Sequence, residues 1–200
     1  MLTGFKFIGE QIGLLEAAHE EYRYIFGFEE SYGYLAGTYV RDKDAVVASM
    51  LICEMAAYYR SIGMSLLDAR EAMYKKYGNY VHTVESFTCE GASGMEEMAK
   101  IMDDLHANTP DSIAGFKVVK VADYLSSVTT DLATKKTEPI TLPKSDVICF
   151  TLENGATVII RPSGTEPKIK AYYTTIAANR ADAEALSKKL SADFKAKLGF

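Results

Sequence analysis

The stretch R-P-S-G-T-E-P-K over residues 161–168 combines residue types that can bind a doubly charged anion. Arg161 offers a planar group of N–H donors that matches phosphate oxygens, and Lys168 adds a point charge. Gly164 permits backbone conformations that turn successive N–H groups toward one point. The residues expected to bind the anion are Arg161, Ser163, Gly164, Thr165 and Lys168. The alternative interpretation is an ordinary hairpin loop in which Arg161 pairs with Glu166.

A second stretch, F-E-E-S-Y-G over residues 28–33, follows an aromatic segment that predicts a short strand. Alternate residues of an extended chain share a face, so Glu29 and Ser31 are expected to point together and Glu30 away. A carboxylate beside a hydroxyl suits the neighbouring hydroxyl groups of a sugar. The alternative interpretation is a solvent-exposed acidic turn.

A third group, R-D-K-D over residues 41–44, places two cations between carboxylates at the start of a predicted helix. From the residue types alone, this group is interpreted as a surface cluster of ion pairs, which contributes little energy.

The elements around the second and third groups predict part of an α/β layer. Apolar spacing predicts a helix over 4–20, and β-branched and aromatic residues predict a strand over 22–28. A long helix begins near Asp42 or Asp44 and ends at 61, and another begins at 65 and ends before Gly78. One strand cannot form a sheet, so residues 1–78 are expected to be an incomplete α/β layered domain.

Residues 79–200 read as a self-contained α+β domain in the order β-α-β-β-β-β-α. The predicted strands are 80–89, 116–124, 146–152, 157–160 and 169–176, and residues 126–144 read as a long excursion. A capping-box spacing at Ser93 and Glu96 opens one helix, and Asn179 caps the last one. The expected fold class is therefore α/β followed by α+β.

Composition narrows the function classes. The 200 residues are 48% hydrophobic and 24% charged with a net charge of −5, which excludes collagen, a disordered tail and a disulfide mini-protein. The negative total disfavours nucleic-acid and membrane partners. Three scattered cysteines predict buried free thiols, and the chain start lacks the features of a signal peptide. A cytoplasmic location is expected, and the Tyr and Met residues over 50–80 are interpreted as helix packing.

The order of these motifs resembles the C-terminal part of the α-D-phosphohexomutases, the phosphoglucomutase/phosphomannomutase family. The matching stretches are T-G-F-K-F-I, F-G-F-E-E-S-Y-G-Y-L, R-D-K-D and R-P-S-G-T-E-P-K, and the resemblance covers essentially the whole chain. It implies that residues 1–78 are the later part of domain three. It further implies that residues 79–200 are domain four, which resembles the TATA-box-binding-protein fold.

The resemblance also implies a reaction. The family interconverts hexose 1-phosphate and hexose 6-phosphate, here with glucose as the expected hexose, through a phosphoserine enzyme and a 1,6-bisphosphate. By residue-to-residue match, Arg161, Ser163, Gly164 and Thr165 would bind the substrate phosphate with Lys168 close by. Glu29 and Ser31 would bind sugar hydroxyls. Lys43 would lie near the reacting oxygen, as a group for proton transfer or charge stabilisation.

Some family features are absent from this sequence. Phe28 stands where relatives often have glycine, and Tyr32-Gly33-Tyr34 stands where some relatives have a histidine. Stretches like T-A-S-H-N-P, which holds the family's phosphoserine, and D-G-D-G-D-R, which holds its Mg²⁺, do not occur. We therefore expect no metal site in this chain, no mutase activity from it alone, and the N-terminal domains of the same enzyme as its partner.

Two other functions are compatible with parts of the sequence. A stand-alone phosphosugar-binding module would use the same two loops, although an incomplete α/β unit would leave apolar surface exposed. A nucleic-acid binder is suggested by the TATA-binding-like topology and by the basic C-terminal end, and it is disfavoured by the acidic total charge.

Overall fold

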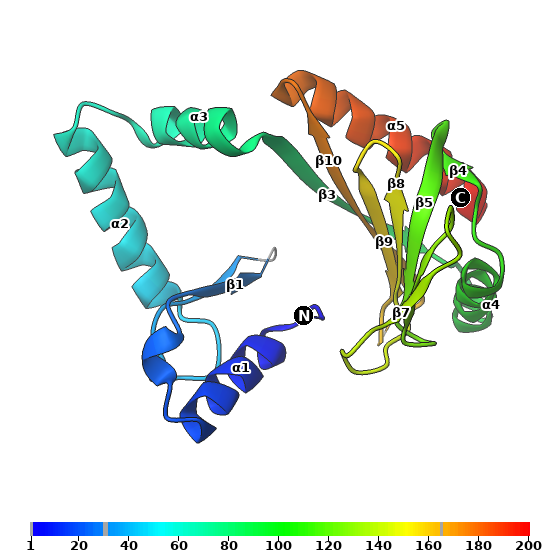
Figure 1. The fold of residues 1–200 in the computed structure, drawn as a ribbon, viewed down its shortest axis with the longest axis horizontal. Coiled ribbons are helices and arrows are strands. Elements are labelled where there is room, and N and C mark those ends of the chain that lie inside the picture. Colours follow the sequence, from blue (N-terminus) through cyan, green and yellow to red (C-terminus); the bar gives the residue numbers. More distant parts are fainter. Residues whose placement is uncertain (1, 30–31, 165) are drawn as a thin grey trace. The chain divides into compact units, whose positions relative to one another are not determined.

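The computed structural model describes residues 2–29, 32–164 and 166–200 (Figure 1). The chain forms two compact units, one up to Met73 and one over Tyr74–Phe200, and each is described by itself. Ser31 and Thr165, two of the predicted site residues, lie outside the described residues.

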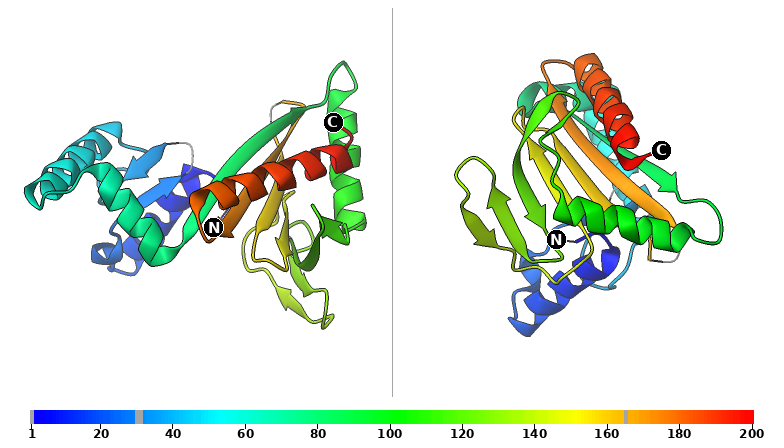
Figure 2. Two further views of the ribbon diagram at one scale, coloured as in Figure 1. Left: turned by 90° about the horizontal axis from the view of Figure 1, so that it is seen from above. Right: turned by 90° about the vertical axis from the view of Figure 1, so that its right-hand side faces the viewer.

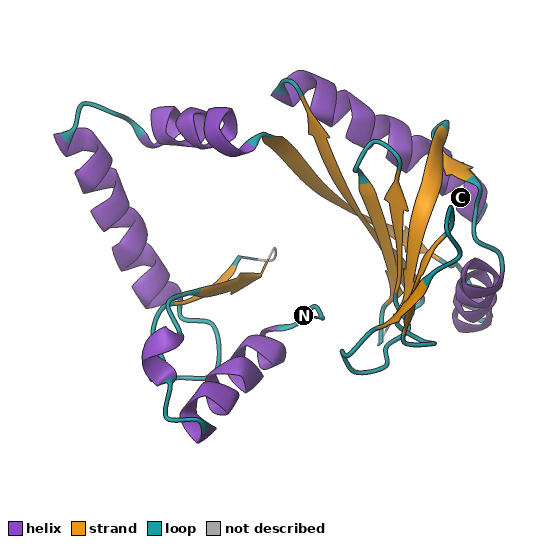
Figure 3. Ribbon diagram, viewed as in Figure 1, coloured by secondary structure: helices purple, strands orange, loops and turns teal. Residues whose placement is uncertain are grey.

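The first unit combines helices with one short antiparallel ribbon (Figure 3). Its elements are α1 (Phe5–Ala17), the 3-10 helix η1 (Glu21–Arg23), β1 (Gly27–Glu29), β2 (Gly33–Leu35), α2 (Ala45–Ser61) and most of α3 (Leu66–Tyr77). The three expected helices are confirmed. The expected strand over 22–28 is wrong in its first half, where η1 forms.

Polar side chains fix the start of α2, and a small core holds α1 to the ribbon. Asp44 caps α2, since its Oδ1 accepts hydrogen bonds from the N–H groups of Val46 and Val47 at 2.8 and 3.1 Å. The core consists of Phe5, Ile8, Ile12 and Leu35, with Tyr24 packed against it. This core lies directly beneath the ribbon that carries Glu29.

The second unit is built on one antiparallel sheet in the order β3-β10-β9-β8-β5-β6-β7, with β4 paired to β5. Its strands are β3 (Asn79–Thr88), β4 (Ser112–Ile113), β5 (Phe116–Asp123), β6 (Val128–Asp131), β7 (Thr137–Pro139), β8 (Ile148–Leu152), β9 (Thr157–Pro162) and β10 (Lys168–Ala177). The mixed helix and sheet content confirms the expected fold class.

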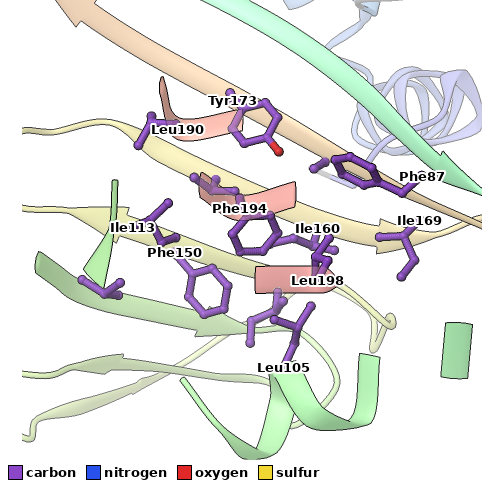
Figure 4. Packing of buried hydrophobic residues seen from close by; sticks show 14 of the residues in the cluster. Phe87, Leu105, Ile113, Phe150, Ile160, Ile169, Tyr173, Leu190, Phe194 and Leu198 are labelled. Carbon is purple, nitrogen blue, oxygen red and sulfur yellow. The ribbon is translucent and has the colours of Figure 1, made fainter. Parts of the chain in front are cut away.

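Helices α4 (Gly94–Ala107) and α5 (Arg180–Leu198) cover one face of this sheet (Figure 2). The core between them is continuous, and its largest fully buried side chains include Tyr173, Phe150 and Phe194 (Figure 4). Apolar residues alternate along the strands toward this core, so the residues between them face the opposite side of the sheet. That opposite face carries the charged residues of β9 and β10.

Two local predictions for the second unit differ from the structure. Ser93 stands at the N-cap of α4 without a side-chain hydrogen bond, so the expected capping box does not form. Residues 126–144, expected as an excursion, contain the hairpin β6–β7, whose turn is held by the Asp131 carboxylate accepting the N–H of Thr134 at 2.7 Å. These two strands have no buried residue, which explains why alternation did not reveal them.

The apolar content of α2 and the cysteines also departs from expectation. Met55 and Tyr58 are exposed rather than packed between helices, and α2 has no buried residue. Cys89 is buried, whereas Cys53 is exposed, so the expectation of buried thiols is wrong for Cys53.

By length and composition, no single described helix could cross a bilayer. Helices α2 and α3 pass that test only when taken together, as a pair bent by 87°.

Candidate phosphate and sugar sites

The hairpin of β9 and β10 positions the predicted anion-binding loop. The strands pair in register, with Lys170 opposite Arg161 and Ile169 opposite Pro162. Across the loop, the N–H of Ser163 donates to the carbonyl oxygen of Lys168 at 2.7 Å. The N–H of Cys89 donates to the carbonyl oxygen of Pro167 at 2.8 Å, which ties the loop to the end of β3. The backbone on both sides of Gly164 is therefore anchored.

Charge gathers on one face of this hairpin. Val158 and Ile160 of β9 are buried, so Arg161 at the next position lies on the face opposite to the helices. Lys170 lies beside it on the same face, and Lys168 is two residues earlier on the same strand. Like charges directly opposite each other destabilise a sheet. An anion bound between them would relieve that repulsion.

The nearby carboxylate of Glu166 does not neutralise the pair formed by Arg161 and Lys170. Glu166 lies in the loop, but its carboxylate accepts from the Lys168 ammonium at 2.9 Å, so the alternative pairing of Arg161 with Glu166 is wrong. Among the residues that the structure describes, no carboxylate forms an ion pair with Arg161 or Lys170. The sequence analysis did not predict Lys170. The strand alternation could have indicated it, because Lys170 comes two residues after Lys168 and therefore lies on the same face of the strand.

Gly164 lies in the predicted anion-binding loop, and its φ is outside the left-handed region. A Cβ at Gly164 would meet no atom of the described residues within 4 Å. The protein's own packing therefore leaves the space above Gly164 open.

The ribbon of β1 and β2 brings Glu29 close to Lys43. Glu29 pairs with Gly33 across the ribbon, and the Lys43 ammonium lies 3.9 Å from the Glu29 carboxylate. A Cβ on Gly33 would lie 2.5 Å from Cδ of Lys43 and 2.9 Å from Cγ of Glu29. Glycine at position 33 thus allows these two side chains to meet on the face of the ribbon that also carries Leu35, which the sequence alone did not indicate.

Lys43 is held in its charged form. Its ammonium donates to the Asp42 carboxylate at 3.0 Å. That hydrogen bond and the nearby negative charges of Asp42 and Glu29 raise the pKa of Lys43, although partial burial acts in the opposite direction. Hydrogen bonds from the backbone N–H and the side chain of Lys43 lower the pKa of Asp42. Lys43 is therefore a cation at neutral pH, suited to stabilising negative charge, whereas the raised pKa makes it a weaker proton donor.

A pocket of about 540 Å³ opens beside Lys43 at the start of α1. Its lining consists of Gly4, Phe5, Lys6, Val40, Arg41, Asp42 and Lys43. Arg41 is occupied by an ion pair with Glu16, whereas the Lys43 ammonium lies 5.2 Å from the centre of the Phe5 ring. Apolar and cationic surface therefore meet next to the Glu29 carboxylate.

The described residues offer no cluster of side chains for a metal ion. Within the described ranges, no three His, Cys, Asp or Glu side chains are placed so that they could hold one ion. The residues present in this part of the chain therefore do not fit a Mg²⁺ site of their own.

Comparison with known proteins decides the family. Residues 1–77 match the model for phosphoglucomutase/phosphomannomutase, alpha/beta/alpha domain III, and residues 89–188 match the model for the C-terminal domain of the same proteins. The chain belongs to the phosphoglucomutase/phosphomannomutase family. The expected resemblance is thus confirmed.

Curated relatives and a solved structure agree with this assignment. A phosphoglucomutase of Staphylococcus aureus (strain bovine RF122 / ET3-1) is 42% identical over 174 residues, which are 87% of this chain and 31% of the relative. A phosphoglucomutase of Staphylococcus epidermidis is 40% identical over the same shares. The open form of the parafusin phosphoglucomutase from Paramecium has a TM-score of 0.58 at 16% identity, covering 98% of this chain and 33% of that one, and supports the fold. The chain thus spans about a third of these relatives.

Proposed function

We propose that this chain provides the substrate-binding part of a phosphoglucomutase, an isomerase of hexose phosphates in carbohydrate metabolism. The observation that carries the proposal is the Arg161–Lys170 pair, two cations opposite each other without an ion-pairing carboxylate among the described residues. The pair lies at the base of the loop whose sequence matches the family's phosphate site. Arg161 would grip the phosphate through two N–H groups, and Lys170 would add charge.

The first unit would hold the sugar. Glu29 has acceptors for hydroxyl hydrogens, and only 15% of its side chain is exposed, so a sugar hydroxyl would displace little water there. We propose that Ser31 binds the sugar hydroxyls together with Glu29. Lys43, charged and 3.9 Å from Glu29, would stabilise negative charge on the oxygen that gains or loses the phosphoryl group.

The complete reaction needs groups that this sequence does not contain. In the proposed scheme a phosphoserine donates its phosphoryl group to a hexose monophosphate, which gives glucose 1,6-bisphosphate, and the serine then takes the other phosphoryl group back. Bound Mg²⁺ would neutralise phosphoryl charge during transfer. We propose that the N-terminal domains of the enzyme supply both groups, and that the chain alone is inactive. We also propose a cytoplasmic location, which the three free thiols support.

A stand-alone phosphosugar-binding module would use the same two sites. The exposed apolar surface of α2 speaks against it, because such a surface is unfavourable in a protein that functions by itself.

Titration with inorganic phosphate and glucose 6-phosphate tests the proposal. Calorimetry should show binding to the wild-type chain, weakened in Arg161→Gln by roughly ten- to hundredfold, the equivalent of about 1.5–3 kcal/mol for a charged hydrogen bond. Lys188→Gln, which removes an exposed charge on α5, is the control and should bind like wild type. Equal affinity of the wild type and Arg161→Gln would refute the assignment.

A further inference from the structure

The anion-binding loop over residues 161–168 carries one carboxylate, and its backbone places that carboxylate beside a lysine. The N–H of Lys168 donates to the carbonyl oxygen of Glu166 at 2.7 Å, which closes a tight turn around Pro167. Proline holds its φ close to one value, so this turn is stiff. Within it, the Lys168 ammonium lies 2.9 Å from the Glu166 carboxylate. The local backbone therefore favours the pairing in addition to the opposite charges.

Elements outside the loop hold this turn in place. The carbonyl oxygen of Pro167 accepts the N–H of Cys89 at 2.8 Å, directly after the end of β3. Gly94, the first residue of α4, is buried against the same segment. A Cβ at Gly94 would lie 3.1 Å from Cβ of Pro167 and 2.3 Å from the carbonyl oxygen of Cys89. The turn that pairs Glu166 with Lys168 is therefore fixed by the packing of the second unit.

The charge of the β9–β10 hairpin matches that of a phosphate ester when this carboxylate is counted. Over residues 157–177 the sequence contains three basic residues, Arg161, Lys168 and Lys170, and one acidic residue, Glu166. These residues give the hairpin a net charge of +2. A phosphate monoester carries about −1.5 to −2 at neutral pH. Without Glu166, the positive charge of the hairpin would exceed the charge of the proposed ligand.

The ion pair between Glu166 and Lys168 is accessible to solvent and to ligands. The Glu166 side chain is 57% exposed and the Lys168 side chain 34% exposed. Ion pairs with this exposure are weak, because water screens both charges. A bound dianion would therefore compete with Glu166 for the Lys168 ammonium, and the affinity of the site would include the cost of opening the pair.

We propose that Glu166 sets the affinity and the charge selectivity of the phosphate site by holding Lys168 back from the bound anion. Arg161 and Lys170 then supply the main attraction, and Lys168 contributes only as far as it leaves Glu166. This inference rests on the proposed function of the loop. In the scheme proposed above, the two phosphoryl groups of one bisphosphate exchange places. A site that held every phosphate very tightly would trap that intermediate without accelerating the transfer.

A double-mutant cycle on the complete chain tests the proposal. The wild type, Glu166→Gln, Lys168→Gln and the double variant are titrated with inorganic phosphate by calorimetry at low salt, where exposed charges are least screened. Glu166→Gln should bind phosphate about two- to fivefold more tightly, the range of an exposed ion pair. Lys168→Gln should weaken binding more in the Glu166→Gln chain than in the wild type, because the two effects are coupled.

A second anion and a control variant make the test specific. Pyrophosphate carries more negative charge than phosphate, so it should gain more from Glu166→Gln. Glu184→Gln removes the carboxylate of the 2.7 Å ion pair between Glu184 and Arg180 on α5. It changes the net charge of the chain by the same amount as Glu166→Gln, and it should bind both anions like the wild type.

Several results would overturn the proposal. Unchanged or weaker phosphate binding in Glu166→Gln would show that Glu166 does not limit the affinity. A gain that persists when Lys168 is also replaced would assign the effect to general repulsion and not to the release of Lys168. An equal gain for phosphate and pyrophosphate would contradict the charge selectivity. Weaker binding of glucose 6-phosphate alone would make Glu166 an acceptor for a sugar hydroxyl.

Failure of this proposal can be told apart from failure of the proposed function. If Arg161→Gln binds phosphate like the wild type, the loop is not the phosphate site. If Arg161→Gln weakens binding and Glu166→Gln brings no gain, the phosphate site stands and only the role of Glu166 is refuted.

Discussion

Arg161 and Lys170 are direct cross-strand partners on the face of the sheet that α4 and α5 leave open. Strand pairing, and not the loop alone, brings these two cations together. Alternation along β9 and β10 buries their neighbours Ile160 and Ile169 in the core. The core therefore fixes where the charged atoms lie, and the proposed phosphate site is preorganised by packing below it.

Lys170→Gln should separate the stability of the chain from its affinity for anions. Removing one of two opposed like charges should leave the phosphate-free chain equally stable or more stable by about 0.2–1 kcal/mol. The rise in melting temperature on adding phosphate should become smaller. Both effects are measured by thermal unfolding, first without phosphate and then at phosphate concentrations raised in tenfold steps. The control Lys188→Gln should change neither. A loss of stability without phosphate would contradict the repulsion between Arg161 and Lys170.

Gly33→Ala should disturb the Glu29–Lys43 pair. The added Cβ would lie 2.5 Å from Cδ of Lys43, so the lysine side chain must move and its contact with Glu29 should lengthen. Affinity for glucose 6-phosphate, measured by calorimetry, should fall. Gly13→Ala in α1 is the matched control, because its Cβ meets no atom within 4 Å and it should stabilise the helix by about 0.5–1 kcal/mol. Unchanged affinity in Gly33→Ala would remove Glu29 and Lys43 from the sugar site.

Two helix caps should differ in their effect on stability. The Asn179 side chain accepts a hydrogen bond from the N–H of Asp182 at 2.9 Å, so Asn179→Ala should cost about 1 kcal/mol. Ser93 stands at the N-cap of α4 without a side-chain hydrogen bond, so Ser93→Ala should cost much less. Urea unfolding of both variants checks the difference. Equal losses would mean that Ser93 caps α4 in solution.

Acid should remove a stabilising contribution of Asp123. Burial alone would raise the pKa of this carboxyl, but hydrogen bonds from Ser126 and from the N–H of Leu125, together with nearby His106, lower it. A carboxyl with a lowered folded-state pKa stabilises the protein above its unfolded pKa of about 3.9. That contribution disappears as the pH falls through the folded-state value. The difference in unfolding free energy between wild type and Asp123→Asn should therefore shrink from pH 6 to pH 3, and a constant difference would contradict it.

The sequence identified the loops better than the contacts inside them. Arg161 and Lys168 were found because the order of residue types in the loop is distinctive, and the helices at α1, α2 and α5 followed from apolar spacing and caps. Lys170 and Gly33 were missed because their importance depends on strand register, which pairs residues distant in sequence. The hairpin β6–β7 was missed because its strands, one half-buried and one exposed throughout, show no alternation of burial.

One of the alternative interpretations, the Arg161–Glu166 pair, was decided by geometry rather than by composition. Nothing in the residue types distinguishes an Arg161–Glu166 pair from the observed Lys168–Glu166 pair at 2.9 Å. Likewise, the Tyr and Met content of α2 indicates packing, but only the structure shows that the expected layer is not formed by the described residues of this unit. The composition of α2 thus indicates an apolar surface, whereas only the sheet topology shows which strands are present beside it.

The pairing of β3 with β10 joins the first strand of the second unit to its last, from Asn79 opposite Ala177 to Thr88 opposite Lys168. The ribosome synthesises β3 long before β10, so the backbone of β3 has no strand to pair with until β10 has been made. Contacts between such distant segments slow folding, and the unit can close only when its C-terminal hairpin has emerged. A premature stop in translation after β9 would therefore leave an edge open to aggregation rather than a smaller working domain.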